Sequence, residues 1–173
     1  TYQEIIENLA GLNPGETLDE DKQLAANLLA DKLKAEHGDT QYAVYAALIK
    51  AKLAVEANNL DIAVSALQWA MDNADEVSKF IARLRLARVE AARGDLDKAL
   101  QLVQGVDAGE MRSAFEEAKG DFYLEQGNGA AAYTAYQSAL ASDVSGDGSV
   151  RALLELKIGL VQPAQLEEPA TEE

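Results

Sequence analysis

The 173-residue sequence contains no cysteine and a single histidine, His37. Without cysteine, the chain has no disulfide, no thiolate metal site and no cysteine nucleophile. One histidine leaves little for imidazole chemistry, and an interaction with the dipole of a helix C-terminus is a better interpretation of His37 than a metal site. No run of 18 apolar residues occurs, so no segment of the sequence has the length of a membrane span.

Basic residues are also scarce. Fifteen Lys and Arg stand against 30 Asp and Glu, which gives a net charge of −15. Such a chain repels phosphate backbones and anionic headgroups, so general nucleic-acid binding is disfavoured. The sequence contains no glycine-rich phosphate loop, no zinc signature and no recognisable nucleophile–base pair. We therefore expect no catalytic residues and no cofactor, and a helical carboxylate hydrolase is only a distant alternative.

The composition favours helices. The sequence has 32 Ala and 23 Leu, whereas residues that favour strands are few. Apolar periodicity predicts helices over 18–37, 40–57, 60–73, 76–93, 96–105, 108–126, 129–142 and 149–160. Residues 1–16 are expected to form a helical stub, and residues 163–173 an acidic, disordered tail.

Residue types at the predicted boundaries indicate how the helices begin and end. Capping boxes are expected at Thr17–Glu20 and Asp107–Glu110. Asp39 or Thr40 can cap the second helix, and Asp75 the fourth. Gly38 is expected to end the first helix in the left-handed conformation.

The same spacing of small and turn residues occurs three times. Each unit has a small residue, a two-residue turn seven positions later, and Ala twelve positions later. The three units are Ala51, Asn58-Asn59 and Ala63; Ala87, Gly94-Asp95 and Ala99; and Gly120, Gly127-Asn128 and Ala132. Small residues let two antiparallel helices cross closely, while the turn needs one residue that tolerates positive φ and then an N-cap.

These features resemble the tetratricopeptide repeat, a helix–turn–helix unit of about 34 residues. The resemblance implies an all-α solenoid of about three units over 17–162, with capping helices at both ends. The sequence departs from the family pattern where Ala47, Arg83 and Glu116 replace the first aromatic residue, and the closing Pro is missing.

A narrower resemblance rests on three strings within 42–141. These strings are Tyr42-Ala43-Val44-Tyr45-Ala46-Ala47-Leu48, Leu84-Arg85-Leu86-Ala87-Arg88-Val89 and Asp121-Phe122-Tyr123-Leu124-Glu125-Gln126-Gly127. Their order and spacing are similar to those of the YfgM family, the ancillary subunit of the SecYEG translocon. Members of this family have a short cytoplasmic N-terminus, one transmembrane helix and a periplasmic tetratricopeptide-like domain.

The resemblance implies a function without catalysis. The domain would lie in the periplasm, tethered to the bacterial inner membrane, and would assist exported client proteins at the exit of SecYEG. Its partners would be the translocon, these clients and the membrane-anchored chaperone PpiD. An alternative from the repeat alone is a soluble tetratricopeptide adaptor that scaffolds an envelope or cytoplasmic complex.

Repeats of this kind line a concave face with the first helix of each pair, and an extended peptide could bind there. The alternative for the apolar residues on this face is that they belong to the core. The residues expected on it are Tyr45, Leu48, Lys52, Val55, Ile81, Leu84, Arg88, Ala91, Ala114, Glu117, Asp121 and Leu124.

Two further patterns have simpler structural interpretations. Six of the fifteen basic residues lie in 79–98 and are expected to pair with nearby carboxylates rather than to dock an acidic partner. The segment Asp143–Gly148 resembles the start of a calcium loop, but the twelfth position is Leu154 instead of a carboxylate. We expect a turn that caps the last helix.

The YfgM resemblance makes a prediction about the gene. The chain begins with Thr1, and we expect the codons upstream to encode one membrane helix and a short cytoplasmic arm. Sequencing the upstream region tests this. A cleavable signal peptide or a bare start codon directly before Thr1 would contradict the family assignment.

Overall fold

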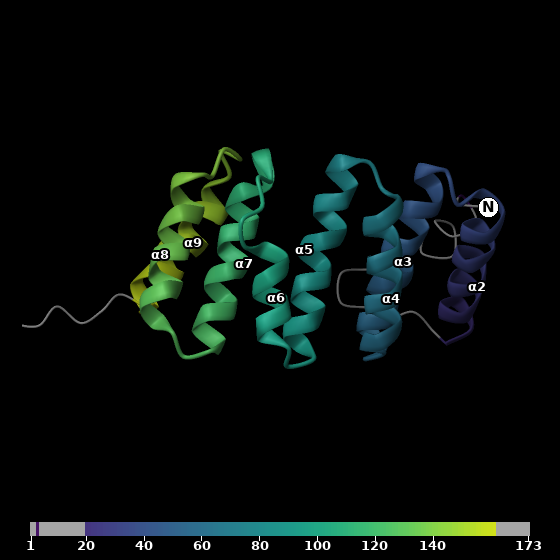
Figure 1. Ribbon diagram of the computed structural model, residues 1–173, viewed down its shortest axis with the longest axis horizontal. Coiled ribbons are helices and arrows are strands. Elements are labelled where there is room, and N and C mark those ends of the chain that lie inside the picture. The colour runs from purple at the N-terminus through teal and green to yellow at the C-terminus, as the bar shows by residue number, and fades with distance from the viewer. Residues whose placement is uncertain (1–2, 4–19, 162–173) are drawn as a thin grey trace, which may run out of the picture. The chain divides into compact units, whose positions relative to one another are not determined.

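The computed structural model describes residues 3 and 20–161, and the fold is all-α throughout these residues (Figure 1). The helical stub, the capping box at Thr17 and the acidic tail lie outside the described residues. The elements are α2 (Glu20–His37), α3 (Gln41–Glu56), α4 (Leu60–Asn73), α5 (Glu76–Ala92), α6 (Leu96–Val103), the 3₁₀ turn η1 (Gly109–Met111), α7 (Arg112–Glu125), α8 (Gly129–Ala141) and α9 (Gly148–Val161). The predicted helices are therefore confirmed, with small changes at their ends.

The chain divides into two compact units, Thr1–Leu102 and Val103–Glu173. The described part of the first unit holds α2 to α6, and that of the second holds η1 and α7 to α9. Within each unit, helices that follow one another in sequence pack side by side in antiparallel fashion (Figure 1). Each unit is described by itself below.

The predicted repeat turns have the expected backbone conformation. Asn58, Gly94 and Gly127 have φ angles of 55°, 87° and 78°. Only a residue that tolerates the left-handed region can occupy these positions at low cost, which explains glycine at two of them and asparagine at the third. The small residues predicted at the helix crossings are all buried: Ala51, Ala63, Ala87, Ala99, Gly120 and Ala132.

Side-chain caps form at most of the predicted helix starts. Asp75 accepts a hydrogen bond from the Ser78 amide at 2.8 Å, and Asp95 accepts one from the Lys98 amide at 3.0 Å. Asn128 caps α8 in the same way. Of the two candidates before α3, Thr40 is the N-cap.

Three predictions about helix ends are wrong. Asn59 precedes α4 but makes no side-chain cap hydrogen bond. The expected box at Asp107–Glu110 does not form, because the chain enters α7 through the η1 turn, whose N-cap residue Ala108 offers no side-chain acceptor. Gly38 does not have a positive φ. A Cβ at Gly38 would lie 2.7 Å from the Lys34 carbonyl oxygen, so glycine is required here by close approach.

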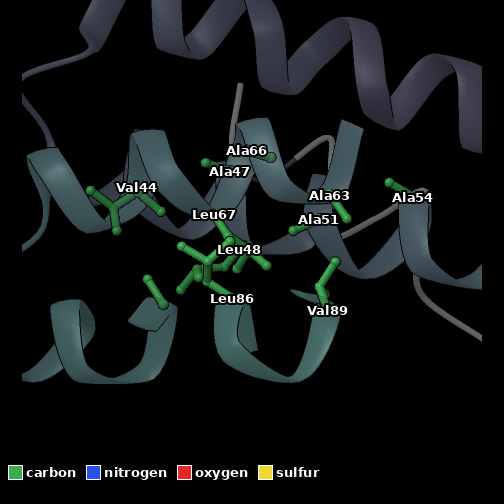
Figure 2. Packing of buried hydrophobic residues seen from close by; sticks show 12 residues of the cluster. Val44, Ala47, Leu48, Ala51, Ala54, Ala63, Ala66, Leu67, Leu86 and Val89 are labelled. Carbon is green, nitrogen blue, oxygen red and sulfur yellow. The ribbon is translucent and has the colours of Figure 1, made fainter. Parts of the chain in front are cut away.

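The main core of the first unit lies among α3, α4 and α5. Leu48, Leu67 and Leu86 point toward one another in its centre, and alanines of α3 and α4 surround them (Figure 2). A second cluster joins α2 to α3 through residues such as Ala30, Ala43 and Leu53. Trp69 of α4 packs against both clusters.

The second unit has a larger side chain at its helix crossing. Tyr136 of α8 is 1% exposed and faces Gly120 of α7. A Cβ on Gly120 would lie 2.5 Å from Cδ1 of the Tyr136 ring, well inside van der Waals contact. In the first unit, Leu67 and Ala51 occupy the equivalent positions in the repeat and both lie in the core cluster. A large aromatic ring is thus accommodated because the facing residue has no side chain.

This packing predicts a strong effect of Gly120→Ala. The added methyl group overlaps a buried ring, so the free energy of unfolding should fall by about 1–3 kcal/mol. Gly129→Ala in α8 is the matched control, since no atom lies within 4 Å of its added Cβ, and its stability should be unchanged or slightly higher. Urea denaturation of both variants measures the difference, and equal stabilities would contradict the account of this crossing.

Candidate functional site

A pocket of about 360 Å³ opens between α3 and α5 in the first unit. Leu67 of α4 contributes to its apolar surface, so all three helices of the main core position it. The remaining lining residues are Ala51, Lys52, Val55 and Glu56 of α3, and Arg85, Arg88 and Val89 of α5. The surface therefore combines apolar side chains with three cations and one carboxylate.

This pocket brings together Lys52, Val55 and Arg88, which the sequence predicted on one face. Tyr45 lies exposed on the same helix, α3. Leu48 and Leu84 are only 8% and 5% exposed and serve as core, the alternative interpretation of these apolar residues. Ile81 is partly buried against the main core cluster.

Sequence reasoning missed Arg85 as a lining residue. Arg85 lies three positions before Arg88, a spacing that places both side chains on one face of α5. This spacing could have identified Arg85 as a lining residue from the sequence. Glu56 was missed as well, and it forms an ion pair with Lys52 at 3.6 Å, one helical turn earlier.

Most of the neighbouring basic residues are used inside the first unit. Arg83 donates a hydrogen bond to the Leu102 carbonyl at 2.7 Å. Glu90, a carboxylate only 1% exposed, pairs with Arg93 at 2.9 Å and with Lys98 at 2.5 Å. The predicted intramolecular pairing is confirmed for these two cations. By contrast, no ion pair or hydrogen bond of the Arg85 or Arg88 guanidinium occurs within the described residues.

In the second unit, the predicted acidic residues of α7, Glu117 and Asp121, form ion pairs. Lys157 of α9 lies 2.7 Å from both Glu117 Oε1 and Asp121 Oδ1. Tyr136 donates a hydrogen bond from its hydroxyl to Asp121 Oδ1 at 2.7 Å, and the Lys157 ammonium lies 5.5 Å from the centre of its ring. Leu124 is exposed near the end of α7, and Ala114 is partly buried near its start.

These contacts shift two pKa values upward. Burial and the hydrogen bond to Asp121 raise the pKa of the Tyr136 hydroxyl far above its usual value. Burial lowers the pKa of Lys157, but its hydrogen bonds to Asp121 and Glu117 outweigh burial, and the net direction is upward. The cluster thus keeps a protonated lysine and a neutral tyrosine over the α7 carboxylates.

The acidic loop before α9 forms the expected capping turn. Asp147 Oδ1 accepts hydrogen bonds from the Ser149 amide at 2.8 Å and from its hydroxyl at 2.7 Å. Asp143 accepts one from the Ser145 amide. The Ser145 hydroxyl and amide lower the pKa of Asp143, and the Ser149 hydroxyl and amide lower that of Asp147. Among the described residues, no three His, Cys, Asp or Glu side chains are grouped so that they could hold a metal ion.

A comparison with known families decides the classification. The model of the tetratricopeptide repeat-like domain family matches residues 1–162. The chain belongs to this family. The all-α, tetratricopeptide-like fold expected from the repeat is thereby confirmed.

Three curated relatives are named ancillary SecYEG translocon subunit. The protein of Aggregatibacter actinomycetemcomitans is 39% identical over 101 residues, which are 58% of this chain and 50% of the relative. That of Escherichia coli K12 is 31% identical over 67% of this chain and 56% of its own length. That of Haemophilus influenzae is 33% identical over 60% and 51%.

These relatives confirm the resemblance to the YfgM family. The chain spans about half the length of the curated relatives it matches. None of the described helices combines the length and the apolar character that crossing a bilayer requires.

The Tyr136–Asp121–Lys157 cluster predicts a loss of stability at alkaline pH. The folded state holds both protons more tightly than the unfolded chain, so the stabilisation is complete below the ordinary pKa values of 10.0 and 10.5 and is lost as pH rises above them. Tyr136→Phe should cost about 1 kcal/mol at neutral pH and make the alkaline loss shallower.

Thermal unfolding between pH 7 and 11 measures this effect. Tyr133→Phe, a change of the same kind on α8, serves as the control and should keep the alkaline profile of the unaltered protein. Parallel profiles for Tyr136→Phe and the unaltered protein would show that the Tyr136 proton is not held in the way described.

Proposed function

We propose that the chain is a non-catalytic protein-interaction domain of an ancillary subunit of the SecYEG translocon. The pocket between α3 and α5 carries this proposal, because the exposed Val55 lies there beside Arg85 and Arg88, which form no ion pair or hydrogen bond within the described residues. The names of the three relatives support the link to the translocon. The tetratricopeptide-like fold supports binding of a protein chain, since this fold serves as a scaffold for recognition.

The helix pairs supply a rigid binding surface. The core of α3, α4 and α5 fixes the spacing of α3 and α5, so the pocket exists before a ligand arrives. An extended chain would bind there through side-chain contacts, because the main chain of both helices is already hydrogen-bonded internally. The proposed binding requires no nucleotide. Low sequence specificity follows, which suits a protein that meets many exported chains.

The finer assignment is also part of the proposal. The domain faces the periplasm, is held at the inner membrane by a single N-terminal anchor, and assists exported proteins as they leave SecYEG. It acts there with a partner chaperone, which the YfgM resemblance identifies as PpiD. The net charge of −15 is compatible with this location, since it keeps the domain away from anionic lipid headgroups.

Site-specific photocrosslinking tests the proposal. A photoreactive residue is placed at Tyr45, Lys52 or Arg88 in the full-length protein, in membranes that hold an exported chain arrested in the translocon. We expect crosslinks to the arrested chain or to a translocon-associated chaperone from all three positions. Gln101 of α6 and Gln137 of α8, both exposed, are the control positions.

Two outcomes oppose the proposal. Equal crosslinking at the pocket and control positions would remove the α3–α5 face as the binding surface. Crosslinks to a single soluble protein, in the absence of any translocon component or exported chain, would instead support a role as an adaptor in another complex.

A further inference from the structure

The α3–α5 pocket has a charge opposite to that of the whole chain. Its lining includes Lys52, Arg85 and Arg88 but only one carboxylate, Glu56, so its surface is cationic. The complete sequence carries a net charge of −15. Because charges more than about 8 Å apart are largely screened at physiological salt, a bound group senses mainly the local cations.

The two arginines are left available for a ligand. Arg83, Arg93 and Lys98 are held by a carbonyl or by the buried Glu90, whereas Arg85 and Arg88 point to the pocket with no such partner in the described part of the chain. Lys52 has only a long pair with Glu56, and its own side chain is 69% exposed. A guanidinium group matches the planar geometry of a carboxylate and can form two parallel hydrogen bonds with it.

The surface between these cations is apolar. Val55 is 44% exposed beside them, and Ala51, Leu67 and Val89 form the floor. The volume of about 360 Å³ is at the lower end of the range for ligand pockets, so it suits one or two side chains rather than a folded element. A ligand therefore needs an apolar side chain for the floor and a carboxylate for the rim.

We propose that the pocket selects extended protein segments in which a bulky apolar residue is flanked by Asp or Glu. This inference rests on the proposed function and adds a preference for one class of segment. Carboxylates on both sides of the apolar residue would reach Arg85 and Arg88 on α5 and Lys52 on α3, on opposite sides of the pocket. A basic segment with the same apolar residue would be repelled.

Peptide binding to the domain tests the preference. Fluorescent peptides of equal length carry one central Leu or Phe flanked by Glu, by Gln or by Lys, and binding is followed by fluorescence anisotropy. We expect the Glu peptide to bind most tightly, the Lys peptide most weakly, and the Glu peptide to weaken as salt is raised. A fourth peptide, with Glu but with Ala in the centre, should also bind weakly.

Charge-reversal variants locate the interaction. The double variant Arg85→Glu, Arg88→Glu should weaken binding of the Glu peptide by at least about tenfold and strengthen binding of the Lys peptide. The control is Lys79→Glu, Arg112→Glu, which changes the net charge equally at exposed positions that do not line the pocket and should leave the Glu peptide's affinity unchanged.

A second pair of variants tests the apolar contribution of Val55 to the pocket. Val55→Ser should weaken binding of every peptide with a central Leu or Phe. Val77→Ser, at a valine of α5 that is 66% exposed and outside the pocket, should not. Circular dichroism confirms that all four variants are folded.

The outcomes separate this inference from the function on which it rests. Equal binding of the Glu, Gln and Lys peptides at the pocket would overturn the charge preference but leave the proposed function standing. Absence of Glu-peptide binding overturns the preference, whereas the proposed function is judged separately by crosslinking in membranes. If the domain self-associates and the arginine double variant abolishes this, the occupant is a second copy and the preference is wrong.

Discussion

The close approach of paired helices at small residues is the constraint on which the structure depends. Ala51 and Ala63 bring α3 against α4, and Gly120 and Ala132 bring α7 against α8. A left-handed residue in each turn lets the second helix begin within a few residues of the first. The high alanine content follows from this geometry, because every crossing removes space for a larger side chain.

The same constraint produces different surfaces in the two units. In the first, Leu67 occupies the position equivalent to Tyr136 and fills the helix crossing. The face between α3 and α5 stays open as a pocket. In the second, Tyr136 fills the crossing and carries a hydroxyl that must find an acceptor, which Asp121 provides. Lys157 then forms ion pairs with both Asp121 and Glu117. At the equivalent repeat position, Leu67 thus lines a cationic pocket in one unit, whereas Tyr136 joins an ionic cluster in the other.

Local sequence signals predicted the fold well, since periodicity, positive-φ residues and most caps depend on neighbours within one helix or turn. They failed at two helix ends where the detailed path of the backbone decides the outcome. Glycine is required at position 38 by its close approach to the Lys34 carbonyl, and α7 begins through the η1 turn. For the site, the spacing of residues along the helices predicted Lys52 and Val55 of α3 and Arg88 of α5. The same spacing could also have predicted Arg85. Lys157 could not be predicted in this way, because 36 to 40 residues separate it from the carboxylates that it holds.

The central claim is that close-packed helix pairs hold the face of α3 and α5 ready to receive an extended chain. Chemical-shift mapping of the amides and arginine side chains, during titration with a segment of an exported protein, tests it most directly. The account predicts that the largest changes occur at Lys52, Val55, Arg85 and Arg88, with the helices intact. Changes concentrated on the outward faces of α4 and α6, with the pocket residues unmoved, would contradict it.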